Sequence, residues 1–402
     1  MPSLSAHLDQ QLEELLSEGV EQARLREAST FDELAGPHQT ELVLFGAGNL
    51  GRFALAGLRK AGIEPLCFVD SDRARWGQEV DGLTVIGPEE GAKLHGDSAA
   101  FVVTIWRGEG AARMATRVAQ LRQLGCKTVV PFLPLFWKFP QSLLPNYLHD
   151  LPHRVCLQSD RVRRAYQLMA DDESRREYLV QLRYRLLGDF GCLPDPVPGP
   201  MYFREELFSL GKDETLVDCG AFDGDTLGLF LEKTGNSFNR AIAFEPDPLN
   251  YTKLLDRVGL MPSGVRERVK LYQAATGEIN ERVLMEVGSG VASQVGKGDH
   301  EVESLALDAV LQDLPVSFIK MDIEGSELAT LRGAKDLIRQ NTPILAISAY
   351  HLQDHLWNIP LFIHELNRDY SLHLRPHMLE GWDLVCYAVP GNRSTKSIDA
   401  NF

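Results

Sequence analysis

The sequence contains no apolar run long enough to cross a membrane and no excess of positive charge. No stretch approaches the roughly 18 consecutive apolar residues of a transmembrane helix, and the first residues lack the basic and apolar blocks of a signal peptide. The formal net charge of −15 repels phosphate backbones and anionic membrane surfaces. We therefore expect a soluble, cytoplasmic protein whose partners include neither nucleic acid nor membrane.

Cysteine is also scarce, with six residues in 402 and no pair in Cys-x-x-Cys spacing. Disulfide frameworks and structural zinc sites both need closely grouped cysteines, so we expect reduced thiols and no zinc site. The composition, 44% hydrophobic and 24% charged, is ordinary for a folded globular chain. The length predicts two or three domains, at about 100–200 residues each.

Two glycine-rich turns follow apolar, strand-like runs, and their charges differ. The first, within residues 42–52, has one basic residue and no acid, whereas the second, within residues 216–226, has three carboxylates. A helix N-terminus with free backbone N–H groups favours an anion, but three acids repel a pyrophosphate. The two turns are therefore expected to hold different ligands.

The pattern along the chain predicts an α/β protein with two sheets. Apolar residues at spacings of three or four predict one amphipathic helix over residues 5–28. Strand-like runs alternate with helical stretches before and after the proline-rich segment 193–200, which can continue neither helix nor sheet. The last two runs, 370–375 and 384–389, have no long helix between them and predict an antiparallel hairpin at one edge. The predicted parts are an N-terminal helical segment (1–40), a smaller Rossmann-like nucleotide-binding domain (41–138), a helical linker (139–200), a doubly wound α/β domain (201–390) and a flexible tail (391–402).

The acidic turn has the features of a nucleoside site. Glu245 ends the next predicted strand, 21 positions after Gly224, and a carboxylate there can accept hydrogen bonds from both ribose hydroxyls. Because the acids disfavour phosphate, a nucleoside that carries a cation suits the turn best. S-adenosylmethionine is such a molecule, and one of the loop acids could receive its ammonium group. The predicted cofactor-binding residues are Asp218, Gly220, Ala221, Phe222, Asp223, Gly224, Asp225, Glu245 and Asp322.

Three blocks of this region, residues 217–226, 243–248 and 318–327, resemble the FkbM-type S-adenosylmethionine-dependent methyltransferases. The third block, Lys-x-Asp-x-Glu-Gly-x-Glu, is the most specific, and the resemblance covers roughly residues 200–390. It implies a class I methyltransferase fold, S-adenosylmethionine as the cofactor and O-methylation of a carbohydrate or small-molecule hydroxyl.

Methyl transfer to oxygen needs a well-placed hydroxyl and a base for its proton. Asp322 and Glu324 lie two apart at the end of a predicted strand and can line the transfer site. Glu324 and Glu327 could instead cap the following helix, and two acids with water can hold Mg²⁺, although we predict no metal. His351 follows the next strand and is the predicted base because its ordinary pKa is near neutrality. Alternative bases are His355, His373 and His377, and possible substrate platforms are Tyr350 and Trp357.

The first glycine turn matches the dinucleotide fingerprint in outline. Gly46, Gly48 and Gly51 follow a strand and open a helix, and Asp70 closes the next strand 19 residues later. Residues 46–89 resemble the small nucleotide-binding domain at the front of some sugar-modifying enzymes, including sialic-acid-type acyltransferases. A nucleotide or nucleotide-linked sugar is the expected ligand; alternatively, the unit only packs against the rest of the chain or forms a homodimer.

The leading hypothesis is a methyltransferase that acts on a small-molecule or glycan substrate. One rival is an oxidoreductase that binds NAD(P) at the first glycine turn, although no hydride-relay residue stands out there. The other is a non-catalytic protein that binds a nucleotide or S-adenosylmethionine. The acidic turn together with Glu245 and Asp322 argues for retained cofactor binding.

Overall fold

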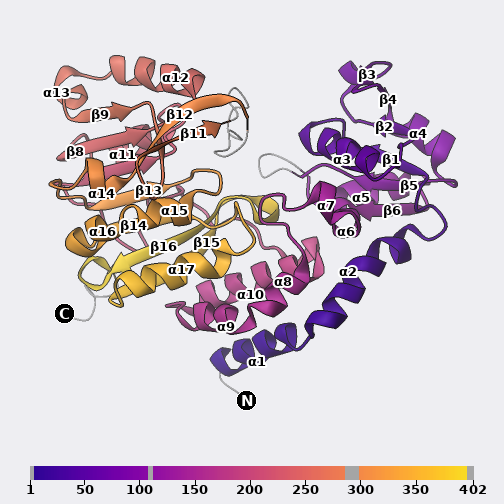
Figure 1. Cartoon of the computed structure of the whole chain (residues 1–402), viewed down its shortest axis with the longest axis horizontal. Helices are drawn as coiled ribbons and strands as arrows, with labels where there is room; N and C mark the ends of the chain where they lie inside the picture. Colours follow the sequence, from indigo (N-terminus) through magenta and orange to yellow (C-terminus); the bar gives the residue numbers. More distant parts are fainter. Residues whose placement is uncertain (1–3, 107–111, 286–297, 396–402) are drawn as a thin grey trace.

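The structure is a computed structural model that describes residues 4–106, 112–285 and 298–395. Figure 1 shows two sheets with their helices, the first in indigo and purple and the second in red, orange and yellow, with a group of helices below them. No helix in the described residues is long and apolar enough to span a bilayer.

The first sheet has six strands in the order β3-β4-β2-β1-β5-β6, and all of them run parallel except β3. β1 is buried along its whole length, because strands with both faces covered bury every side chain. The strands are β1 (Leu42–Phe45), β2 (Cys67–Val69), β3 (Glu79–Val80), β4 (Leu83–Ile86), β5 (Ala100–Val103) and β6 (Thr128–Pro131). The intervening helices are α3 (Asn49–Lys60), η1 (Arg73–Arg75), α4 (Pro88–His95) and α5 (Met114–Gln123).

The second sheet has seven strands in the order β15-β16-β14-β13-β7-β8-β9. β16 is antiparallel to both of its neighbours, so the predicted edge hairpin is confirmed. The strands are β7 (Thr215–Cys219), β8 (Arg240–Phe244), β9 (Val269–Tyr272), β13 (Phe318–Met321), β14 (Ile344–Ser348), β15 (Tyr370–Pro376) and β16 (Leu384–Pro390). The helices are α11 (Asp225–Lys233), α12 (Pro248–Gly259), α13 (Ser263–Arg266), α14 (Leu307–Val310), α15 (Glu327–Arg332), α16 (Lys335–Asn341), α17 (His355–Leu366), η4 (Leu379–Gly381) and η5 (Gly391–Arg393).

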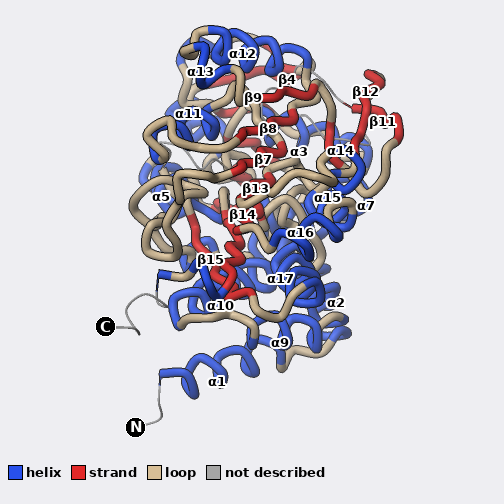
Figure 2. Tube along the Cα trace, turned by 90° about the vertical axis from the view of Figure 1, so that its left-hand side faces the viewer, coloured by secondary structure: helices blue, strands red, loops and turns tan. Residues whose placement is uncertain are grey.

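A small three-stranded sheet, β10-β12-β11, was not predicted from the sequence. Its strands are β10 (Ala275–Thr276), β11 (Glu281–Met285) and β12 (His300–Leu305). β11 and β12 pair in an antiparallel arm that stands off the second sheet in Figure 2. Most of their side chains are exposed, so the apolar alternation that identifies a half-buried strand is weak here.

The N-terminal segment contradicts the prediction of one helix over residues 5–28. Two helices form, α1 (Leu4–Leu16) and α2 (Val20–Ala35), and the chain between them is extended at Gly19. Glycine is a poor helix former, and the break lets each helix pack on a different partner, α1 on α10 and α2 on α6 and α8. The connecting helices are α6 (Phe132–Lys138), α7 (Pro140–Leu143), α8 (Pro152–Leu157), α9 (Ser159–Gln167), α10 (Asp172–Leu187) and η2 (Phe190–Cys192).

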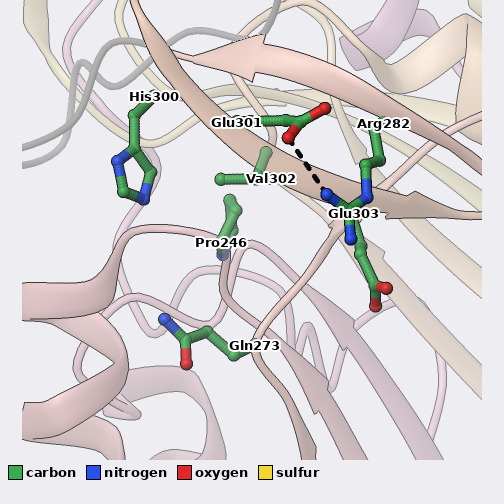
Figure 3. Close-up of a pocket in the computed structure, with 7 residues that line it drawn as sticks. All are labelled: Pro246, Gln273, Arg282, His300, Glu301, Val302 and Glu303. Carbon is green, nitrogen blue, oxygen red and sulfur yellow. Dashed lines mark hydrogen bonds and ion pairs between the residues drawn. The ribbon is translucent and has the colours of Figure 1, made fainter.

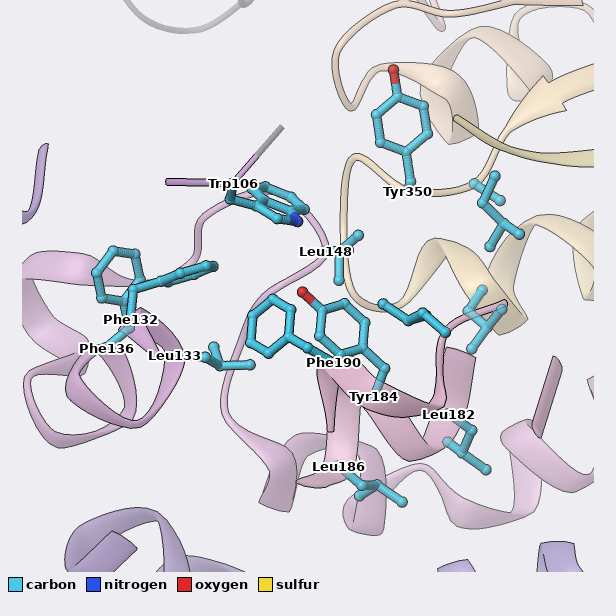
Figure 4. Packing of buried hydrophobic residues seen from close by; sticks show 14 of the residues in the cluster. Trp106, Phe132, Leu133, Phe136, Leu148, Leu182, Tyr184, Leu186, Phe190 and Tyr350 are labelled. Atoms are coloured by element: carbon cyan, nitrogen blue, oxygen red, sulfur yellow. The ribbon is translucent and has the colours of Figure 1, made fainter. Parts of the chain in front are cut away.

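One apolar core runs from the first sheet through the connecting helices to one face of the second sheet. Figure 4 shows part of this core, in which Trp106, Phe132 and Tyr184 pack near one another. A second core covers the opposite face of the second sheet, so alternate residues of β7 belong to different cores. The first sheet, the connecting helices and the second sheet are thus joined by one continuous apolar core.

Candidate functional site

The acidic turn after β7 is closed by Glu245 at the end of β8. One carboxylate oxygen of Glu245 accepts a hydrogen bond from the backbone N–H of Phe222 at 2.8 Å, and the other accepts one from Asp247 at 2.9 Å. Burial raises the pKa of Glu245 to about 7, although these two N–H groups oppose the shift. The carboxylate is therefore held at the carboxyl edge of the sheet, where a ribose would bind.

Asp218 does not face the turn as a free acid. Its side chain is 1% exposed, and the ammonium group of Lys320 on β13 lies 3.0 Å from a carboxylate oxygen. Lys320 also donates to the carbonyl oxygen of Gly220 at 2.6 Å, so this buried pair fixes the backbone of the turn. Burial raises the pKa of Asp218 to about 6, and the charge of Lys320 opposes that rise.

The other two loop acids lie nearer to solvent. Asp223 forms an ion pair with Arg257 of α12 at 3.1 Å, and Asp225 is exposed and accepts a hydrogen bond from the backbone N–H of Thr226. Of the three candidates for an ammonium group, Asp225 is therefore the one without an ion-pair partner among the described residues.

The turn is in direct contact with the end of β13. Gly220 has a φ of +79°, and a Cβ atom there would come within 2.0 Å of the carbonyl oxygen of Asp322. Only glycine permits both this conformation and this approach. The predicted cofactor turn and the predicted transfer residues consequently belong to one site.

A cluster of charged side chains surrounds the imidazole of His351, which follows β14. Its Nε2 atom lies 3.4 Å from a carboxylate oxygen of Asp322 and 3.8 Å from one of Glu324. Asp322 also accepts hydrogen bonds from the hydroxyls of Tyr202 at 2.8 Å and Tyr350 at 3.3 Å. The structure thus brings together Asp322, Glu324 and His351, the three residues predicted for transfer chemistry.

From the sequence, Glu327 could cap the following helix or line the transfer site, and the structure places it beside His351. Its oxygens accept hydrogen bonds from the N–H groups of Ile323 and Gly325 in the loop before α15, and the helix itself has no side-chain cap. In addition, its Oε1 atom lies 2.7 Å from Nδ1 of His351, and both side chains are wholly buried. The sequence signal was its place as the last acid of the Lys-x-Asp-x-Glu-Gly-x-Glu block.

The pKa values of this cluster reflect burial and mutual charge. Burial lowers the pKa of His351, but Glu327, Glu324 and Asp322 together raise it to about 10. Burial raises the pKa of Glu327, but His351, His355 and the backbone N–H of Ile323 bring it down to about 2. Burial raises the pKa of Glu324 to about 8 despite the charge of His351. The imidazole is therefore charged at neutral pH, and Glu324 is largely protonated.

Within the described ranges, one group of side chains could reach a common metal ion: ligand atoms of Asp322, Glu327 and His351 lie within 4.8 Å of one another. The oxygens of Glu327 already accept hydrogen bonds from two backbone N–H groups and from His351. These hydrogen bonds occupy the oxygens of Glu327, one of the three candidate ligands.

The alternative bases and platforms lie in different places. His355 is buried behind Glu327, at 3.4 Å, whereas His373 pairs with Asp171 of the connecting helices at 2.8 Å. His377 contacts the hydroxyl of Tyr387 at 2.8 Å. Trp357 is wholly buried, so the suggestion that it forms a substrate platform is wrong. Of these residues, Tyr350 lies beside the cluster.

A cavity of about 280 Å³ is lined by Pro246 and Gln273, which follow the ends of β8 and β9. Figure 3 shows Pro246 and Gln273 on one side and the β11–β12 arm on the other, where Arg282 pairs with Glu301. Its volume is close to the lower end of the range for ligand pockets, about 300 Å³. Residues 274–277 follow Gln273 of this cavity directly in the chain.

The first glycine turn repeats the same backbone geometry. Asp70 accepts hydrogen bonds from the N–H groups of Ala47 and Asp72, each at 2.8 Å, as Glu245 does in the second turn. A Cβ at Gly51 would lie 1.8 Å from the carbonyl oxygen of Gly46, so close packing requires the third glycine. At Gly48 no protein atom lies within 4 Å of such a Cβ.

The strand order of the second sheet and the acid-closed glycine turn define a class I methyltransferase fold. Residues 218–375 match the family model of the methyltransferase FkbM domain. A methyltransferase FkbM from Methylobacillus flagellatus KT is similar in fold over nearly the whole chain: TM-score 0.75, 23% identity, 96% of this chain and 99% of that chain.

Two shorter structural matches also lie among methyltransferases. The precorrin-6y C5,15-methyltransferase of Geobacter metallireducens GS-15 is 16% identical over 45% of this chain and 82% of its own, with a TM-score of 0.29. Fibrillarin of Aeropyrum pernix, with bound S-adenosyl-L-methionine, is 11% identical over 45% of this chain and 69% of its own, with a TM-score that is also 0.29. A comparison with curated proteins found no match.

Proposed function

We propose that the protein is an S-adenosylmethionine-dependent O-methyltransferase that acts on a carbohydrate or small-molecule hydroxyl. The contact between Gly220 and Asp322 is the observation that carries this proposal, because it joins the cofactor turn to the cluster around His351. Glu245 would hold the ribose hydroxyls, and the cavity beside Pro246 and Gln273 would take the adenine ring.

The cluster can position a hydroxyl and take its proton. When bound, S-adenosylmethionine supplies a methyl group on a positively charged sulfonium. Glu327 fixes Nδ1 of His351, so the ring presents Nε2 toward Asp322, and the imidazole is the proposed proton acceptor. An imidazole with a pKa of about 10 already carries its proton at neutral pH. It can act as the acceptor only when a cation beside Asp322 lowers that pKa through charge repulsion. Asp322 and Glu324 would orient the acceptor.

Calorimetric titration with S-adenosylmethionine, S-adenosylhomocysteine and NAD tests the cofactor assignment. We expect both adenosyl ligands to bind, and Glu245→Gln to weaken them about tenfold or more, since a hydrogen bond to a charged group contributes about 1.5–3 kcal/mol. Glu232→Gln, an exposed acid on α11, is the matched control and should bind as the wild type does. Folded protein that binds NAD but neither adenosyl ligand would favour the oxidoreductase and overturn the proposal.

We also infer a nucleotide or nucleotide-sugar at the first glycine turn, held through Gly46, Gly48, Gly51 and Asp70. Gly48 has a φ of −85° and open space around its Cα, so the fold does not require glycine there, whereas an approaching phosphate would. Gly48→Ala should leave the melting temperature unchanged and abolish binding of uridine diphosphate glucose. Gly19→Ala, equally unobstructed, is the control. Equal binding by Gly48→Ala and wild type would remove this site.

A further inference from the structure

The loop that ends β5 reaches the turn between β15 and β16. The ring of Trp106 lies 4.2 Å from that of Trp382, and the indole N–H of Trp106 donates to the carbonyl oxygen of Glu380 at 2.9 Å. Tyr147, from the loop after α7, lies 5.1 Å from Trp382, and Tyr350 lies 5.8 Å from it. We call Tyr147, Tyr350 and Trp382 the aromatic wall; Trp106 packs behind it.

The aromatic wall borders the charged cluster. The ring of Tyr350 lies 4.1 Å from His351, and the ring of Tyr147 lies 6.3 Å from it. Figure 4 shows Trp106 and Tyr350, from loops far apart in the chain, on either side of Leu148. A molecule whose hydroxyl reached Asp322 and His351 would therefore meet these rings with the rest of its surface.

Three buried polar atoms at this place have no hydrogen-bond partner in the described structure. They are Oε2 of Glu324, Nε2 of His351 and the indole nitrogen of Trp382. An unpaired buried polar group costs about 1–3 kcal/mol, so such atoms call for an explanation. The carboxyl group of Glu324 can accept a hydrogen bond, or donate one when it is protonated, and the indole N–H donates, so a hydroxyl can satisfy either group.

The backbone around these residues is also strained. Tyr147, Glu324, Glu380 and Asp383 have φ values of +50°, +54°, +59° and +50°, a region that residues other than glycine rarely adopt. Strain of this kind persists where the surrounding structure holds a side chain in one place. The strained residues include Tyr147 of the aromatic wall and Glu324 of the charged cluster. Glu380 and Asp383 lie close to Trp382 in the chain.

We propose that the acceptor is a sugar-ring polyol, whose apolar face stacks on Tyr147 and Trp382 while its hydroxyls reach Glu324 and the indole N–H of Trp382. Trp106, which follows β5 of the first sheet, is a positioning residue: its ring packs against that of Trp382 and fixes its place. The acceptor site is thus made by both halves of the chain, and part of it lies outside the matched methyltransferase domain, residues 218–375. This inference rests on the proposed function.

Saturation-transfer NMR on the full chain with bound S-adenosylhomocysteine tests the acceptor class. The probes are the methyl pyranosides of glucose, galactose and mannose, with trans-1,2-cyclohexanediol as a ring that has fewer hydroxyls. At least one pyranoside should receive saturation on its ring C–H protons, and the diol should bind about tenfold or more weakly. If the adenosyl ligand binds but no pyranoside does, or the diol binds equally well, this inference fails while the proposed function stands.

Substitutions in the aromatic wall test whether the pyranoside binds there. Tyr147→Ala and Trp382→Ala should raise the pyranoside dissociation constant about tenfold or more and leave that of S-adenosylhomocysteine unchanged. Trp106→Ala should do the same, and Trp106→Phe should restore most of the affinity. Phe53→Ala, which removes a 37% exposed ring from α3, is the control and should change neither constant. Unchanged pyranoside affinity in folded Tyr147→Ala and Trp382→Ala would overturn the assignment.

Discussion

Glu327 holds the imidazole of His351 from behind, with Oε1 2.7 Å from Nδ1 and neither side chain exposed. A carboxylate in this position sets which ring nitrogen carries the hydrogen and keeps the other nitrogen directed at the reacting groups. Because the same carboxylate binds the N–H groups of Ile323 and Gly325, the orientation of the imidazole is tied to the loop that precedes α15.

Replacing Glu327 with glutamine should lower the pKa of His351, since the charge of Glu327 is the strongest influence that raises it. Imidazole NMR titration should show the fall, and turnover should drop about tenfold or more because the ring loses its fixed orientation. The affinity for S-adenosylhomocysteine should stay the same. Glu365→Gln, an exposed acid on α17, is the control. An unchanged His351 titration in folded Glu327→Gln would contradict this prediction.

Glu324→Gln should make the protein more stable in mildly alkaline solution. Burial raises the pKa of Glu324 from 4.5 to about 8, so the folded protein keeps a proton that the unfolded chain releases between these values. Stability from this group therefore falls as pH rises from about 4.5 to 8. Chemical unfolding at several pH values should show a shallower fall for the variant, and identical slopes would contradict the prediction.

Asp171→Asn should make the stability of the protein less sensitive to acid. Burial raises the pKa of Asp171, but hydrogen bonds from His373, Arg375 and Ser174 outweigh it and hold the pKa well below its ordinary value. The stability from this carboxylate is present above its unfolded pKa of about 3.9 and is lost as pH falls toward the folded value. The wild type should lose stability more steeply than the variant below about pH 4.

Gly220→Ala should destabilise the protein by about 2 kcal/mol or more, because a positive φ and a clash with Asp322 act together. Gly235→Ala is the matched control: its φ of +56° is also positive, but no atom lies within 4 Å of an added Cβ. Gly235→Ala should lower the free energy of unfolding by about 1 kcal/mol. Denaturant unfolding measures both, and equal losses would show that the clash at Gly220 is relieved.

Much of the second sheet was predictable because its strands are short apolar runs bounded by glycine, proline or acids. Asp322, Glu324 and His351 were expected to meet because they follow neighbouring strands, and parallel strands bring their carboxyl ends to one edge. The β11–β12 arm was missed because its exposed side chains leave no clear alternation.

Local patterning was sufficient for the strands, the two glycine turns and the acids that close them, since these depend on near neighbours and backbone conformation. The pairing of Lys320 with Asp218, the hold of Glu327 on His351 and the meeting of Trp106 with Trp382 join residues that are 102, 24 and 276 positions apart. Such contacts depend on how the elements pack, which no local pattern encodes. Packing also makes His351 a charged group, because the acids Glu327, Glu324 and Asp322 outweigh the effect of burial and override the ordinary pKa from which its role as a base was first inferred.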